Sequence, residues 1–243
     1  MTSIAIVGNP PFADALASLC RKAGHRVEVH DAEVLNDAAP GHIPLFDKSI
    51  VIDFYHHSDK SFALWNLESL IPPSTLVLTS ALPSSVTLAG YDMGLPERLV
   101  GFSIIPPLNQ GDPVEVARGL RTSDNAFRKA LEFWQSLDLE PVEVGDGPGL
   151  VRARVLACLV NEAISALAEG VATARDIDTA MKLGTNYPRG PLEWGAYLGM
   201  DTIYGVMRGL HQEWGEDRYR PHPLLRRIAL ADAQEKIWQT AQR

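Results

Sequence analysis

The chain has 243 residues, of which 46% are hydrophobic and 21% charged, and its formal net charge is −8. This size and composition are ordinary for a globular protein with one large domain or two modest ones. The negative charge argues against nucleic acid or an anionic membrane as the main partner, but it does not exclude an anionic ligand in a local pocket. No membrane span, targeting segment or metal-ligand spacing is present, so we expect a cytoplasmic protein without a metal.

Strand and helix signals alternate through the first half of the chain. Continuous apolar runs predict buried strands, and amphipathic stretches between them predict helices. This alternation predicts an α/β fold with a mostly parallel sheet covered on both faces. The predicted strands are 3–8, 25–31, 48–54, 74–80, 97–105 and 140–145, and the predicted helices are 12–24, 61–71 and 123–137. Residues 32–47 are polar and weakly patterned, and their conformation stays open.

The pattern changes after Pro148 and Gly149, where strand signals cease and only helices are predicted. A Thr cap opens one of these helices at 173, and Gly184 closes it. We therefore expect two domains, a shortened α/β domain over 1–147 and an all-α domain over 148–243. The predicted helices of the second domain are 150–170, 173–184, 191–199, 200–215 and 222–239.

The opening stretch "IAIVGNPPFADAL" has the strand–turn–helix order of a dinucleotide-binding turn. Such a turn uses three small residues, and here those positions read Gly8, Pro10 and Ala13. Pro10 and its neighbour Pro11 lack the N–H groups that would face a phosphate. Asp31 lies 23 residues after Gly8, at the place where an acid binds a ribose hydroxyl, although it could equally just end a strand. We expect a structural turn with weak or absent dinucleotide affinity.

The second half carries a family resemblance. The stretch "PGLVRARVLACLVNEAISALAEGVATARDIDTAMKLGTNYPRGPLEW" closely resembles the start of the C-terminal domain of 3-hydroxyacyl-CoA dehydrogenases. The later "EDRYRPHPLLRR" is similar to the bacterial branch that handles intermediates such as 3-hydroxyadipyl-CoA. In the first half "IVIDF", "PPSTLVLTSALPSS" and "PERLVGFSIIPP" follow in the family's order. The resemblance implies a Rossmann-type domain, NAD as cofactor, an acyl-CoA-like small-molecule ligand and a place in fatty acid metabolism.

The implied reaction is oxidation of the 3-hydroxyl of an acyl-CoA, in which a base takes the hydroxyl proton while hydride leaves carbon. The family supplies that base as a His in "G-x-H-F-F-N-P", with a Glu twelve residues later. This chain reads "GFSIIPP", which places Ser103 at the His position and Pro106 at the Asn position. Glu115 retains the family Glu, twelve residues beyond Ser103. A serine hydroxyl is not a base at neutral pH unless another group activates it.

Other family site residues are replaced as well. A second Asn corresponds to Ala153, and the Asn of the family's "SNTSS" loop corresponds to Ala81, while Ser84 is an uncertain match for the loop's Ser. The long helical hairpin that the family inserts here, and that helps to hold CoA, is absent, since Asp31 and Asp53 lie only 22 positions apart. These losses together predict that the family reaction is weak or lost.

One replacement for the base is available in "DFYHHSDK", which follows a predicted strand at the sheet edge where ligands bind. His56 and His57 lie where the family has residues near the nicotinamide ribose. His57 is a candidate relocated base. The alternative is a surface loop with two solvated imidazoles.

The helical domain keeps the family's features. Its resemblance implies a homodimer, and the alternative is that its apolar face is buried internally. A basic cluster near the C-terminus either faces a phosphate or pairs with Glu216 and Asp217.

The rival to a weakened dehydrogenase is a non-catalytic binding or scaffold protein that dimerises with itself or with an intact homologue. The apolar positions of the first helix are Val155, Leu156, Leu159, Val160, Ala163, Ile164 and Leu167, and the basic residues are Arg218, Arg220, Arg226 and Arg227.

Overall fold

The computed structural model describes residues 2–32, 45, 47–56, 60–231 and 237–238. The chain divides into two compact units, residues 1–151 and 152–243. The predicted boundary, after residue 147, lies in the segment that leads from the last strand into the helices. Each unit is described by itself.

A mostly parallel sheet forms the centre of the first unit, as the sequence predicts. Its order is β2-β1-β3-β4-β5-β6-β7, and the β5–β6 pair is antiparallel while the other pairs are parallel. Strands β1, β3 and β4 are almost wholly buried because both of their faces are covered. The strands are β1 (Ser3–Val7), β2 (Arg26–His30), β3 (Ile50–Asp53), β4 (Leu76–Ser80), β5 (Leu99–Ser103), β6 (Pro113–Arg118) and β7 (Glu140–Val144).

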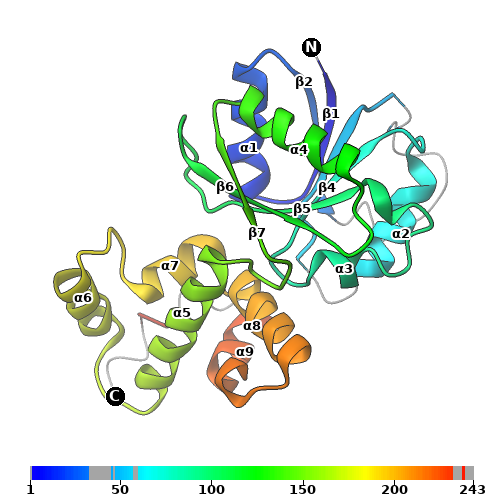
Figure 1. Cartoon of the computed structure of the whole chain (residues 1–243). Helices are drawn as coiled ribbons and strands as arrows, with labels where there is room; N and C mark the ends of the chain where they lie inside the picture. The colour runs from blue at the N-terminus through cyan, green and yellow to red at the C-terminus, as the bar shows by residue number, and fades with distance from the viewer. Residues whose placement is uncertain (1, 33–44, 46, 57–59, 232–236, 239–243) are drawn as a thin grey trace. The chain divides into compact units, whose positions relative to one another are not determined.

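Helices cover both faces of this sheet (Figure 1). Helices α1 (Phe12–Lys22) and α4 (Asp124–Ser136) lie on one face, and α2 (Lys60–Leu70) and the short α3 (Val86–Ala89) lie on the other. Side chains alternate between the faces along each strand, so Phe102 of β5 packs on Trp134 of α4, with 5.0 Å between ring centroids. Gly101 faces α3, where a Cβ would lie 2.1 Å from a methyl of Val86. This alternation decides which face each residue of the site occupies.

Two elements of the first unit were not predicted. Strand β6 has the sequence "PVEVAR", which is short and begins with Pro and contains two charged residues, so its pattern is weak locally. It becomes a strand because it pairs with both β5 and β7, a contact that no local pattern encodes. Helix α3 has four residues and is capped by Asp146, whose carboxylate accepts hydrogen bonds from the backbone N–H groups of Val86 and Thr87 at 2.6 and 3.0 Å.

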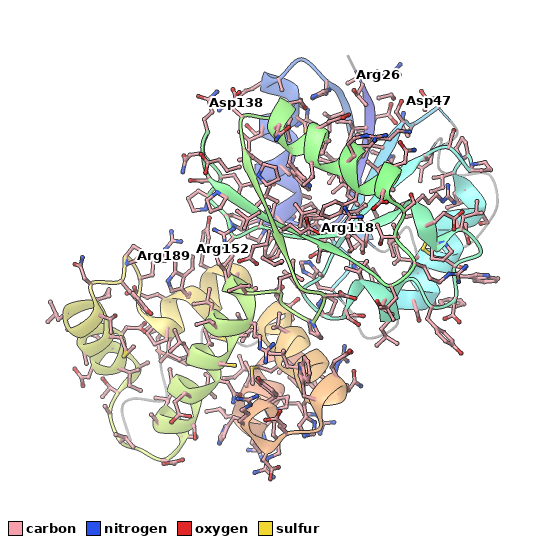
Figure 2. All side chains as sticks on the ribbon, in the orientation of Figure 1. Arg26, Asp47, Arg118, Asp138, Arg152 and Arg189 are labelled. Carbon is pink, nitrogen blue, oxygen red and sulfur yellow. The ribbon has the colours of Figure 1, made fainter. Side chains whose placement is uncertain are left out.

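Charged side chains gather at the amino edge of the sheet, where Figure 2 labels Arg26 and Asp47 near each other. The Lys48 ammonium is buried there, 2.9 Å from a carboxylate oxygen of Glu28 and 2.8 Å from one of Asp47. A cavity of about 620 Å³ opens beside this cluster, lined in part by His25 and Lys48. This hollow lies at the opposite edge of the sheet from the predicted site residues.

The second unit is helical throughout its described part. Buried apolar residues hold α5 against α7 and α8, among them Val160, Ile164 and Leu210. Val155 is an exception among the apolar positions predicted for the first helix of this unit, because its side chain is 54% exposed. The basic cluster pairs with acids in part, since Arg218 binds Glu216 at 2.7 Å. The helices are α5 (Arg152–Ala168), α6 (Ala174–Thr185), α7 (Pro191–Leu198), α8 (Met200–Trp214), a 3-10 turn (Asp217–Tyr219) and α9 (Pro223–Leu230), which ends well before the predicted residue 239.

A buried carboxylate fixes the start of α7. Asp178 of α6 is 2% exposed and accepts hydrogen bonds from the backbone N–H groups of Leu192 and Glu193, at 2.8 and 3.0 Å. Gly190 precedes α7, and a Cβ there would lie 2.2 Å from the Asp178 carboxylate, so the close approach requires glycine. In the part of the chain that the structure describes, no helix is long and apolar enough to cross a membrane.

Candidate functional site

The predicted site residues meet at the carboxyl edge of the sheet. Strands β1, β3, β4 and β5 run parallel, so the residues that end them or follow them lie at one edge. Gly8 follows β1, Asp31 follows β2 and Ser103 ends β5. The sheet order reverses direction between β1 and β3, and such a point is where α/β sheets bind ligands.

Ser103 and Glu115 face each other across the antiparallel β5–β6 pair, in which their Cα atoms are register partners. Ser103 is 1% exposed, and its hydroxyl has no hydrogen-bond partner among the residues that the structure describes. The Glu115 side chain is also buried, and its Oε2 accepts a hydrogen bond from the backbone N–H of Val151 at 3.1 Å. The structure therefore brings these two predicted residues together, but as a buried hydroxyl and an engaged carboxylate rather than as an imidazole held by a carboxylate.

The neighbouring loop after β4 is apolar at its start. Ala81 is buried, its backbone N–H donates to the carbonyl of Phe102 at 2.9 Å, and its carbonyl accepts from Gly149 N–H at 2.7 Å. Ser84 donates its hydroxyl hydrogen to the carbonyl of Ser85 at 2.9 Å. Ala81 carries no polar side-chain atom and the Ser84 hydroxyl donates within its own loop, so neither side chain extends the Ser103–Glu115 pair into a larger polar site.

The turn after β1 is closed by neighbouring groups. The Gly8 backbone N–H donates to the carbonyl of His30 at 2.9 Å, and the Ala13 N–H of the first turn of α1 donates to Asn9 O at 3.2 Å. A Cβ on Gly8 would lie 2.5 Å from the Cβ of Phe54, which shows how closely the residue after β3 approaches the turn. Asp14 places an exposed carboxylate in the first turn of α1, where it interacts favourably with the helix dipole and would repel a phosphate. These residues do not fit the diphosphate of a dinucleotide.

His56 lies beside this turn and is half-buried. Its Nε2 is 3.0 Å from the Ser80 hydroxyl, and its ring lies edge-on to Phe12, with 5.1 Å between centroids. Ser80 is the register partner of Phe102, which packs on α4, so the Ser80 side chain faces the α1 and α4 side of the sheet. Ser103 follows Phe102 in β5, so its side chain faces the opposite side. His56 therefore does not occupy the position of the missing base. The other candidate, His57, lies outside the described residues.

A buried ionic cluster at the same edge escaped the sequence reasoning. Asp53, the last residue of β3, is fully buried and accepts hydrogen bonds from Lys60 Nζ at 2.8 Å and from the hydroxyl of Thr79 at 2.5 Å. Lys60 Nζ also donates to the Tyr55 carbonyl at 2.8 Å. Burial lowers the pKa of Lys60, and the Asp53 charge opposes that decrease. The signal was an Asp ending an otherwise apolar strand, with a Lys seven residues later.

The Asp53–Lys60 cluster is a structural element. Each hydrogen-bonding atom in it has a partner within the first unit, and the contacts tie the start of α2 to the ends of β3 and β4. The loop that carries His56 begins and ends at these two residues. The cluster therefore holds the loop's two ends in place.

Two sequence profiles match the chain. One described as 3-hydroxyacyl-CoA dehydrogenase, NAD binding domain, matches residues 56–147, and one described as 3-hydroxyacyl-CoA dehydrogenase, C-terminal domain, matches residues 149–237. The first match begins after β3, so the turn at Gly8 lies outside it.

Curated relatives agree with these profiles. The chain is 37% identical over 165 residues to a probable 3-hydroxybutyryl-CoA dehydrogenase of Deinococcus radiodurans, a match that covers 68% of this chain and 59% of that one. It is 44% identical over 123 residues to the 3-hydroxyadipyl-CoA dehydrogenase of Escherichia coli, covering 51% and 26% of the two chains. The matched region is thus about 59% of the length of relatives such as the Deinococcus protein.

A solved structure with a similar fold is that of an (S)-3-hydroxybutyryl-CoA dehydrogenase from Ralstonia eutropha. The TM-score is 0.74 at 25% sequence identity, and the match covers 96% of this chain and 94% of that one. The two-unit architecture described above is therefore shared along almost the whole chain.

Proposed function

Because the chain belongs to the 3-hydroxyacyl-CoA dehydrogenase family, we propose that it keeps the family scaffold but oxidises a 3-hydroxyacyl-CoA with NAD weakly or not at all. The observation that carries this proposal is the buried Ser103 hydroxyl opposite Glu115. The ligand class that the family suggests is a small acyl-CoA-like thioester. Activity, ligand and partners of this chain all belong to the proposal.

The chemistry of the Ser103–Glu115 pair supports the loss. The oxidation needs a base that takes the hydroxyl proton as hydride departs, and a neutral serine hydroxyl has no proton affinity for that task near pH 7. Glu115 is buried and accepts a backbone hydrogen bond, which supports a structural role for its carboxylate. Loss of a positioned general base costs a rate factor of roughly 10²–10⁴, which is about 3–5 kcal/mol of barrier.

The helical unit supports a second role as a dimeric binding protein. Val155 on α5 is 54% exposed and Leu183 on α6 is 83% exposed. Single exposed apolar side chains are common, whereas a contiguous apolar patch marks a surface that another chain covers, so this role requires these side chains to belong to such a patch. We propose that this unit forms a homodimer, so that a chain without catalysis still presents a symmetric pair of family-like folds.

The experiment that tests the proposal measures NAD reduction by purified full-length chain with 3-hydroxybutyryl-CoA, and NADH oxidation with acetoacetyl-CoA. An intact 3-hydroxybutyryl-CoA dehydrogenase, such as the relative from Clostridioides difficile, is assayed beside it. We expect a rate at least 100-fold below that of the intact enzyme. Size-exclusion chromatography with light scattering on the same sample measures the oligomeric state.

The outcomes separate the alternatives. Turnover at the rate of the intact relative would overturn the proposal. A low turnover that His57→Ala abolishes and Ser103→Ala leaves unchanged would assign the base to His57. Absence of turnover together with a dimeric mass supports the binding-protein role.

A further inference from the structure

Aromatic side chains fill the first unit where the sheet order reverses direction. Phe54 follows β3 directly, and its backbone N–H continues the ladder by donating to Val7 O at 2.8 Å. Since Asp53 faces α2, Phe54 faces the opposite side, toward the start of α1. Its ring centroid lies 5.9 Å from that of Phe12 and 5.2 Å from that of Phe102. His56 closes the group, 6.3 Å from Phe54.

This aromatic group is packed as a core. Phe12 and Phe54 are each 3% exposed, and Phe102 is fully buried. The Phe12–His56 and Phe54–Phe102 pairs meet edge-on, the geometry that aromatic rings favour and that adds to the stabilisation from burial. A dinucleotide passes its phosphates between the first glycine turn and the strand on the other side of this crevice. In this chain the Phe54 side chain lies beside Gly8 and against Phe12 at the start of α1, on the same crevice.

The closure involves backbone as well as side chains. Gly8 has only a hydrogen as its side chain, and a Cβ built on it would lie 2.5 Å from the Cβ of Phe54 and 3.4 Å from its ring atom Cδ2. In a dinucleotide-binding turn, glycine lets the backbone come close to the ligand. In this chain Gly8 lets Phe54 come close to the turn. The Asp14 carboxylate places a negative charge at the N-terminus of α1, whose positive dipole end would otherwise attract a phosphate.

We infer that Phe54 is the residue that excludes a dinucleotide from this chain, by filling the crevice between β1 and β3 with an aromatic core built on Phe12 and Phe102. The inference deepens the proposed function and rests on it for the choice of NADH as the probe. It is independent of Ser103, because it concerns whether the cofactor binds rather than whether a base is present.

The test compares NADH binding to the wild type, to Phe54→Ala and to the double variant Phe54→Ala/Asp14→Asn. Binding is measured by NADH fluorescence and by thermal shift, since a ligand that binds the folded state raises the unfolding temperature. We expect no saturable binding by the wild type at about 1 mM NADH, which means a Kd weaker than about 1 mM. We expect binding at least tenfold tighter by the double variant, with Phe54→Ala between the two. Phe62→Ala, the same substitution at a side chain that is 50% exposed, serves as the matched control and should resemble the wild type.

A second variant controls for misfolding, because truncating a buried Phe leaves a cavity and strongly destabilises the fold. Phe54→Leu keeps most of the apolar contact and should fold where Phe54→Ala does not, with a smaller gain in binding. Saturable wild-type binding with the affinity of the variants overturns the inference, as does a set of folded variants that bind no better than the wild type.

Failure of the inference about Phe54 and failure of the proposed function give different experimental results. Wild-type binding without turnover overturns the role of Phe54 and leaves the proposed loss of chemistry intact. Turnover by the wild type at the rate of the intact relative overturns the proposed function. Binding by the Phe54 variants without turnover is expected if both hold, because Ser103 still stands where the base is needed.

Discussion

Replacing Lys60 by methionine should strongly destabilise the first unit. Lys60 is 2% exposed and Asp53 is fully buried, and the two charged atoms are 2.8 Å apart. Methionine keeps the length and apolar character of the lysine stem but removes the ammonium group. The Asp53 carboxylate then keeps hydrogen bonds from Thr79 and from the backbone N–H of Tyr55, but it has lost the buried cation opposite it.

The magnitude follows from the asymmetry of buried ion pairs. Removing one partner leaves an uncompensated buried charge and typically costs about 3–5 kcal/mol, whereas removing both charges is often nearly neutral. The Tyr55 carbonyl also loses the hydrogen bond that Lys60 Nζ donates to it, which adds to the cost. Against a total stability of roughly 5–15 kcal/mol, such a loss is large.

Urea unfolding of the full chain, followed by far-UV circular dichroism, measures the effect. We expect Lys60→Met to lower the free energy of unfolding by about 3–5 kcal/mol. The double variant Asp53→Asn/Lys60→Met should lose less than the single one. Lys22→Met, the same change at an exposed lysine of α1, should stay within about 0.5 kcal/mol of the wild type. A loss below about 1 kcal/mol for Lys60→Met, or a double variant less stable than the single one, would refute the reasoning.

Three further effects are expected. Asp178→Ala should lower the free energy of unfolding by about 2 kcal/mol, because two N–H groups at the start of α7 lose their acceptor, and an unchanged melting temperature would contradict this. Asp146→Ala should speed amide exchange in α3, which loses its capping carboxylate, while exchange in α4 stays the same. Burial lowers the pKa of His30 below 6.5, so the unfolded chain binds more protons than the folded chain as the pH falls through 6.5, and the stability of the folded chain decreases. His30→Gln should therefore reduce the difference in urea midpoint between about pH 7.5 and about pH 5.5. A difference equal to that of the wild type would show that His30 does not cause it.

Much of the fold was predictable because its pattern is local. Strands β1, β3 and β4 are continuous apolar runs, and such runs predict strands buried on both faces wherever they occur. Helix α4 begins after Ser123, whose hydroxyl accepts from the Ala126 backbone N–H, a capping signal contained in four residues. The substitution of Ser103 for the family base was also readable from the sequence, since a residue type is a local fact.

Other features depend on contacts between distant segments. Strand β6 exists because β5 and β7 pair with it, and its own residues favour no strand strongly. Lys60 reads as an ordinary first residue of a helix until the fold places it against Asp53 and Thr79. Phe54 reads as one more apolar residue after a strand until Gly8 and Phe12 lie beside it.

The sequence by itself therefore determined the class of fold, the order of most elements and the missing imidazole, because periodicity and residue identity are written along the chain. The tertiary structure decided which charges are buried together, which face of the sheet each side chain occupies and what fills the crevice after β1. Those properties depend on register and on the distance between segments far apart in sequence, and a shift of one residue in register would move each side chain to the other face.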